Sequence, residues 1–142
     1  MQGQPAQLVE LAAALIRARG RLRLGVHGSS MLPAIRPRDV LLVRACAASR
    51  ARVGDIVVFV REGRLFSHRV VARHGARLVT RGDAVPEADA PVEPSELLGC
   101  VRRVVRGSRV FRPAGRPSRA SCVFRHSPLS SRIFQRIAAW SP

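Results

Sequence analysis

The hydrophobic residues near the N-terminus recur with the spacing of one face of a helix. The apolar positions of this stretch are Leu8, Leu11, Ala12, Leu15 and Ile16. Their separation by three or four residues is typical of an amphipathic helix. Gly20 follows directly, and glycine commonly ends a helix. The pattern therefore predicts a helix over residues 7–19.

From Leu22 onward, the apolar residues occur in short runs rich in β-branched side chains. Gly, Pro or Asp separate these runs, as is typical of strands joined by turns. The predicted strands cover residues 22–24, 40–43, 55–60, 68–73, 77–80, 97–105 and 109–112. Residues 61–63 and 74–75 have the composition of hairpin turns. The middle of the chain is therefore predicted to be mainly β.

Two further segments differ in composition from the strands. Residues 86–94 contain three prolines and three acids, which predicts a loop that crosses the surface. After Phe111 the chain is rich in Pro, Gly, Ser and Arg, and only residues 131–140 regain helical spacing. We therefore expect an N-terminal amphipathic helix within residues 1–21, one β domain over residues 22–112, and a basic tail with a short amphipathic helix over residues 113–142.

All 25 basic residues of the chain are arginine, and lysine is absent. This excludes mechanisms that need a lysine amine, such as a Ser/Lys dyad, a Schiff base or a P-loop. A general base that works near neutral pH must then be one of the four histidines, a carboxylate or an activated cysteine.

Positive charge is concentrated in the last third of the chain. Residues 1–99 contain 15 arginines and nine acids, whereas residues 100–142 contain ten arginines and no acid. This imbalance indicates either a surface that binds polyanions or an arginine-biased genome. The chain has no Tyr and only six aromatic residues, so it lacks the stacking platforms of single-strand binders. Nucleic acid is therefore not the partner we expect, whereas peripheral association with an anionic membrane stays open.

The cysteines and the apolar runs indicate where the protein works. Cys46, Cys100 and Cys122 form no CxxC or Cys/His pattern and are too few for a disulfide scaffold. We expect free thiols and no metal or other cofactor. The longest apolar runs, residues 11–16 and 56–60, are shorter than the ~18–20 residues that a membrane-spanning helix needs. No secretory signal is recognised at the N-terminus, so we expect a cytoplasmic protein, held at most at a membrane surface.

Five short segments place polar residues at the ends of apolar strands. They are Gly28-Ser29-Ser30-Met31-Leu32-Pro33-Ala34-Ile35, Arg38-Asp39-Val40, Gly54-Asp55-Ile56-Val57-Val58-Phe59, Ser67-His68-Arg69-Val70-Val71, and Thr80-Arg81-Gly82-Asp83 continuing to Asp89-Ala90-Pro91-Val92. A serine before a Met-x-Pro break can present its hydroxyl from a tight turn, with a histidine as its base. In order and spacing, these segments resemble the S24/S26 serine peptidases, the group that contains type I signal peptidases and self-cleaving LexA-like repressors.

The resemblance implies a mainly β, coiled antiparallel fold with a serine nucleophile. In this group, bacterial signal peptidases and LexA-like proteins use lysine as the base, whereas endoplasmic-reticulum and archaeal-type signal peptidases use histidine. Because this chain has no lysine, the resemblance implies Ser30 as nucleophile and His68 as general base. The histidine-type enzymes also orient the imidazole with an aspartate, which by spacing is Asp89, although Asp83 stays open for this role.

The resemblance also implies the surroundings of the nucleophile. The backbone N–H of Ser30 is the implied oxyanion donor. Many signal peptidases carry a serine two residues before the nucleophile, where this chain has Gly28; Ser29 or a water is the alternative second donor. Met31, Pro33 and Val57 are implied to help form the substrate site.

Two arginines near these segments have expected roles of a structural kind. Arg69 is expected to pair with an acid such as Asp83 or Asp55. Arg38 stands where the family pattern usually has glycine, so the conformation of this turn is not predicted. Of the other histidines, His27, His74 and His126 are poorer candidates for the base.

The leading interpretation is a serine endopeptidase that cleaves an extended precursor or leader peptide laid against a strand edge. One alternative is LexA-like self-cleavage, for which Ala114–Gly115 is the candidate bond. Only 29 residues precede Ser30, fewer than we expect for the DNA-binding domain of such repressors. The other alternative is an inactive fold that binds nucleic acid or a membrane through its basic part.

Overall fold

The N-terminal element is a helix, as its hydrophobic spacing predicts. The structure is a computed structural model that describes residues 4–121. Helix α1 (Gln4–Arg19) begins three residues before the predicted start. It ends at Gly20, whose φ of 67° lies in the left-handed region that favours glycine. The N–H of Gly20 donates to the carbonyl of Ile16 at 2.8 Å and closes the last turn.

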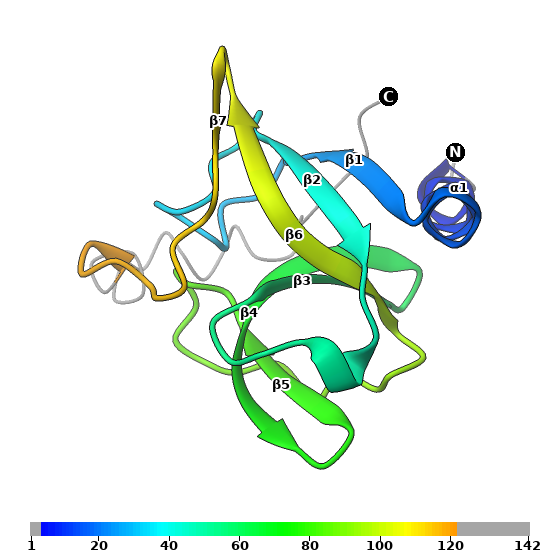
Figure 1. Ribbon diagram of the computed structural model, residues 1–142. Coiled ribbons are helices and arrows are strands. Elements are labelled where there is room, and N and C mark those ends of the chain that lie inside the picture. Colours follow the sequence, from blue (N-terminus) through cyan, green and yellow to red (C-terminus); the bar gives the residue numbers. More distant parts are fainter. Residues whose placement is uncertain (1–3, 122–142) are drawn as a thin grey trace.

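The rest of the fold is one antiparallel sheet of seven strands (Figure 1). The strands are β1 (Arg21–Gly25), β2 (Val40–Ala45), β3 (Ile56–Arg61), β4 (Arg64–His74), β5 (Arg77–Arg81), β6 (Leu97–Arg106) and β7 (Arg109–Phe111). They are ordered β1-β2-β6-β3-β4-β5, with β7 paired to β6. A short 3₁₀ helix, η1 (Ala48–Arg50), follows β2. The prediction of a mainly β, antiparallel fold with an N-terminal helix is confirmed.

Both predicted hairpin turns are present. Glu62 and Gly63 have φ values of 51° and 69° and join β3 to β4, while Gly75 has a φ of 61° and joins β4 to β5. Residues 86–94 form the predicted loop between β5 and β6. One bridge ties this loop to the sheet, between Leu78 and Val92. The helix predicted over residues 131–140 lies outside the described residues.

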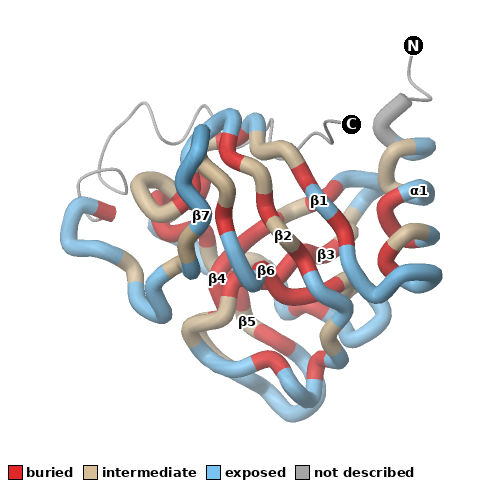
Figure 2. The backbone as a smooth tube through the Cα atoms, turned by 45° about the horizontal axis from the view of Figure 1, so that its top comes forward, coloured by how far each residue is buried: buried red, intermediate tan, exposed pale blue. Residues whose placement is uncertain are grey.

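The core divides into two hydrophobic clusters on opposite faces of the sheet. The first cluster joins Ala12 and Ile16 of α1 to apolar residues of β1, β2, β3 and β6. The second cluster lies among β3, β4 and β5 and includes Val57 and Phe59. Figure 2 shows the buried residues gathered on the central strands. Strand β3 is buried on both faces, which explains why residues 56–60 form an unbroken apolar run.

This arrangement brings together residues that are distant in the sequence. The loop between β1 and β2 carries Ser30, strand β4 carries His68, and the loop between β5 and β6 carries Asp89. No helix in the described part of the chain is long and apolar enough to cross a membrane. The apolar face of α1 is packed against the sheet, so this face contributes to the core.

Candidate active site

Ser30 stands in a compact turn between β1 and β2. The N–H of Leu32 donates to the carbonyl of Ser29 at 3.2 Å, and the N–H of Ile35 donates to the carbonyl of Met31 at 3.0 Å. Met31 and Ile35 are buried in the first cluster, so the apolar residues of the turn anchor it to the core. Ser30 itself is 3% exposed. The backbone of this segment thus holds the serine hydroxyl in a defined position.

The base of the same loop contains a strained residue. Arg38 has a φ of 74°, in the left-handed region, and this is the position where the family pattern has glycine. Its N–H donates to the carbonyl of Val26 at 2.8 Å, and the N–H of Val26 donates to the backbone carbonyl of Asp39 at 2.9 Å. Arg106 pairs with the buried Asp39 through both carboxylate oxygens, at 2.9 and 2.7 Å. These contacts close the loop despite the missing glycine.

His68 lies on β4 and reaches the serine from the sheet. Its Nε2 atom is 3.2 Å from the Oγ of Ser30, and the residue is 2% exposed. The rings of Phe59 and Phe66 meet the imidazole edge-on, with centroids 6.1 and 6.0 Å away. Two aromatic walls therefore limit how far the imidazole can turn.

Asp89 meets the other nitrogen of the same imidazole. Its Oδ2 atom is 2.6 Å from Nδ1 of His68. The N–H of Asp89 donates to the carbonyl of Thr80 at 2.8 Å, and the Thr80 hydroxyl donates to Oδ2 at 2.7 Å. Ser30, His68 and Asp89 form a line of hydroxyl, imidazole and carboxylate, the arrangement that makes a serine hydroxyl nucleophilic.

Asp83, the alternative partner for His68, has a different contact. It forms a two-pronged ion pair with Arg69, at 2.8 and 2.7 Å. Its N–H points to the Sδ of Met31 at 3.4 Å. The neighbouring Ala84 donates to the carbonyl of Ser30 at 2.8 Å. Of the two acids left open for Arg69, the structure pairs it with Asp83, and Asp83 supports the turn that holds Ser30.

Gly82 lies where the turn that contains Asp83 packs against the backbone of Ser30. A Cβ atom at this position would lie 2.7 Å from the carbonyl oxygen of Ser30 and 3.1 Å from its Cβ. Residues of the two loops are therefore in direct backbone contact, which only glycine permits here. This explains physically why the motif has Gly before Asp83.

Arg61 holds the loop that carries Asp89, a role that the sequence did not reveal. Its guanidinium donates to the carbonyls of Ala90 and Pro91 at 2.9 and 3.0 Å. It also pairs with Glu96 at 3.1 and 2.9 Å. The hydrogen bond from Arg61 lowers the pKa of the Glu96 carboxyl and raises that of Arg61.

The three residues implied for substrate binding differ in exposure. Met31 is 3% exposed and Val57 is fully buried, whereas Pro33 is half-buried. Pro33 follows a cis peptide bond after Leu32. Of the three side chains, Pro33 therefore has the most exposed surface.

The other candidates in the described part of the chain take no part in this line. His27 and His74 are exposed, and His126 and Cys122 lie outside the described residues. Cys100 is buried in the second cluster, and burial raises the pKa of its thiol. Among residues 4–121, no group of three or more His, Cys, Asp or Glu side chains could hold a metal ion.

The backbone N–H of Ser30 is the oxyanion donor that the resemblance implies. Within the described residues, no protein group accepts a hydrogen bond from it. Gly28 lies two residues earlier and is buried, and Ser29 is half-buried. The Ser30 amide is therefore available to an external acceptor, such as the oxygen of a peptide carbonyl that the Ser30 hydroxyl attacks.

The family comparison agrees with this fold. The family model described as Peptidase S24-like matches residues 4–102, which include α1, strands β1 to β5 and the segments that carry Ser30, His68 and Asp89. The chain belongs to the Peptidase S24-like family. No curated protein matches the chain.

Proposed function

We propose that this protein is a serine endopeptidase of the histidine-base type, similar in chemistry to endoplasmic-reticulum and archaeal-type signal peptidases. Ser30 is the nucleophile, His68 the general base and Asp89 the residue that orients the imidazole. The observation that carries the proposal is the unbroken contact from Oγ of Ser30 through both ring nitrogens of His68 to Asp89, at 3.2 and 2.6 Å.

The chemistry follows from these contacts. His68 Nε2 accepts the hydroxyl proton while Oγ of Ser30 attacks the scissile carbonyl, and the same proton then passes to the leaving amine. The acyl group left on Ser30 is released by a water that His68 activates in the same way. Asp89 accepts the Nδ1–H of His68, which keeps Nε2 free to take the proton. The Ser30 amide stabilises the oxyanion, a contribution of about 3 kcal/mol for one such donor.

The substrate proposed is an extended precursor or leader peptide. The enzymes that this chain resembles prefer small residues just before the cut, and we propose the same preference here. Half-buried Pro33 beside the turn is the proposed contact for the residues that precede the scissile bond. The buried side chains of Met31 and Val57 are proposed to limit the space available to the residues before the cut.

Self-cleavage at Ala114–Gly115 is a second candidate, and one observation bears on it. The carbonyl of Ala114 accepts a hydrogen bond from Arg69 at 2.6 Å. Arg69 follows His68 on β4 and therefore points to the opposite face of the strand. This contact must break before the bond can reach Ser30. Mass spectrometry of the purified chain after incubation tests the idea, and an intact mass over days would exclude it.

The experiment that tests the proposed function uses a proteome-derived peptide mixture as substrate. Mass spectrometry of the digest should reveal new peptide termini that follow small residues. Ser30→Ala and His68→Ala should each abolish these termini while leaving thermal stability nearly unchanged. Ser108→Ala is the matched control, because it removes an exposed hydroxyl in the turn between β6 and β7 and should retain activity. Equal cleavage by wild type and Ser30→Ala would overturn the proposal.

A further inference from the structure

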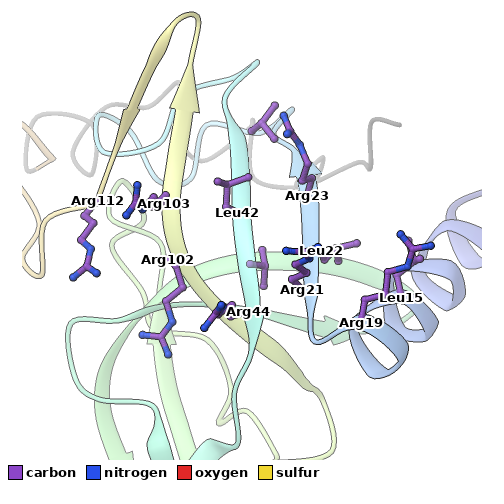
Figure 3. A pocket seen from close by; sticks show the side chains of 12 residues that line it. Leu15, Arg19, Arg21, Leu22, Arg23, Leu42, Arg44, Arg102, Arg103 and Arg112 are labelled. Atoms are coloured by element: carbon purple, nitrogen blue, oxygen red, sulfur yellow. The ribbon is translucent and has the colours of Figure 1, made fainter.

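A groove lined with arginines runs along one face of the sheet (Figure 3), and neither Ser30 nor His68 lines it. It has a volume of about 1060 Å³ and runs over β1, β2 and β6, between the end of α1 and the segment after β7. Seven arginines line it: Arg19, Arg21, Arg23, Arg44, Arg102, Arg103 and Arg112. All seven are exposed, and no acidic residue lines the groove.

The strand register explains why these arginines gather. Arg21 of β1 lies directly opposite Arg44 of β2. In the next row, Leu42 of β2 lies between Arg23 of β1 and Arg103 of β6. The register of β2 and β6 shifts between Leu42 and Val43, as in a β-bulge, which re-aims side chains on the bulged strand. Consecutive residues Arg102 and Arg103 are consequently both exposed on this groove.

Nothing within the described part of the chain neutralises this charge. The ion pairs found among residues 4–121 use Arg61, Arg69, Arg77, Arg106 and His68, none of which lines the groove. Like charges directly opposite each other on a sheet destabilise it. Because the chain has no lysine, the choice of arginine carries no information, but its clustering without acids indicates an anionic partner.

The shape of this surface distinguishes between kinds of anionic partner. A surface that enters a bilayer presents protruding apolar side chains, and the large hydrophobic residues that are most exposed in the described chain, Leu11, Val53 and Val110, do not line the groove. The apolar residues that do line it are buried or half-buried, such as Leu22 and Leu42. The phosphodiester backbone of a single strand is flexible, so it can enter the groove and follow the twist of the sheet. A flat membrane surface contacts mainly the rim of the groove.

We propose that this groove binds the phosphodiester backbone of a single-stranded nucleic acid without sequence preference. The sequence disfavours nucleic acid because aromatic stacking platforms are scarce, and no aromatic residue lines the groove. The protein therefore makes no base-specific contacts, and arginine–phosphate contacts supply the affinity. This binding is independent of the peptidase activity proposed for Ser30.

The test measures fluorescence anisotropy of a labelled oligothymidylate strand of about 20 nucleotides, which exceeds a typical single-strand site. Binding should be readily detected at about 50 mM salt and should weaken steeply as salt increases. If each of the seven groove arginines contacts one phosphate, the slope of log K against log salt should approach about −5. Absence of binding at low salt would overturn the proposal.

Two variants with equal loss of charge separate the groove from net charge. Arg21→Gln, Arg44→Gln and Arg103→Gln together should weaken binding about tenfold or more and reduce the slope by about 2. The matched control replaces three exposed arginines outside the groove, Arg36, Arg50 and Arg52, and should change affinity less than about twofold. Equal losses in the two variants would show that net charge, not the groove, attracts the strand.

Membrane binding is the competing outcome, and vesicles test it. In sedimentation with vesicles of phosphatidylcholine and phosphatidylserine, the protein should bind the vesicles more weakly than it binds the oligonucleotide at the same salt concentration. Strong vesicle binding that the groove variant abolishes, together with weak oligonucleotide binding, would overturn the proposal in favour of a lipid surface. Thermal unfolding of both variants should show intact folding, and Arg44→Glu alone offers a milder variant with a single reversed charge.

Discussion

Arg69 and Asp83 form a buried, two-pronged ion pair that joins the strand of His68 to the turn supporting Ser30. The two contacts measure 2.8 and 2.7 Å, and the side chains are 2% and 1% exposed. Arg69 also donates to the carbonyls of Gly54 and Ala114. Arg69 follows His68, which contacts the Ser30 hydroxyl, and Asp83 precedes Ala84, which donates to the Ser30 carbonyl. The ion pair therefore stabilises both the fold and the geometry of the site.

Replacement of Asp83 by Asn should destabilise the protein strongly. Arg69 would keep its charge in the interior without a carboxylate, and breaking a buried pair in this way costs about 3–5 kcal/mol. Denaturant unfolding should show this loss. The exposed pair of Arg77 and Glu93, with side chains 58% and 49% exposed, provides the control: Glu93→Gln should cost less than about 1 kcal/mol. Similar losses at the two sites would contradict this role for Arg69 and Asp83.

The rate of peptide cleavage should depend on the protonation of His68. A general base must be neutral to accept a proton, so cleavage at limiting substrate should be slower in acid than at neutral pH. The measurement is the initial cleavage rate across acidic to neutral pH, with circular dichroism at each pH to verify folding. An optimum in acid would point to a carboxylate base and contradict the role of His68.

Thr80 should position Asp89 without touching substrate. Thr80 is fully buried, and its hydroxyl and the Nδ1 of His68 meet the same oxygen of Asp89. Thr80→Val keeps the shape of the side chain and removes the donor, so kcat should fall about tenfold, equivalent to ~1.4 kcal/mol, with little change in KM. Thr80→Ser should restore the rate. A merely structural role would instead lower stability and leave kcat unchanged.

The strands could be predicted from the sequence because each carries its own signal. Residues 56–60 form a continuous apolar run, and Gly63 and Gly75 mark the hairpin turns that the structure contains. The positions of Ser30 and His68 were also predictable, because a family motif records them. The choice between Asp83 and Asp89 was not, since both lie in one short segment and only the path of the chain separates them.

Other features depend on register and on contacts distant in the sequence. Arg61 and Glu96 are 35 residues apart, and no local pattern indicates that they meet. The arginine groove requires that β1, β2 and β6 lie side by side and that the register shifts at Leu42. Strand order and bulges are tertiary properties. For this reason, the sequence predicted the amount of positive charge but not where the fold concentrates it.

Gly82→Ala should damage the site through direct steric contact. The new Cβ would lie 2.7 Å from the carbonyl oxygen of Ser30 and 2.6 Å from Cγ2 of Val85. Because the serine must move, peptide cleavage should fall by roughly 100-fold, while overpacking should lower stability by about 1–3 kcal/mol. Gly115→Ala is the control, since a Cβ there meets no atom within 4 Å. An unchanged cleavage rate in Gly82→Ala would show that the Ser30 turn tolerates this shift.

Loss of the Glu96 carboxylate should change how stability depends on pH. The hydrogen bond from Arg61 lowers the pKa of Glu96 in the folded protein, below the value of ~4.3 that glutamate has in unfolded chains. The pair therefore stabilises the fold fully above that unfolded value, and the contribution disappears as pH falls through the lower, folded pKa. Wild type should exceed Glu96→Gln in unfolding free energy by up to about 1 kcal/mol near pH 7. Urea unfolding at several pH values should show this difference vanish in acid, whereas a difference that grows in acid would contradict the pairing.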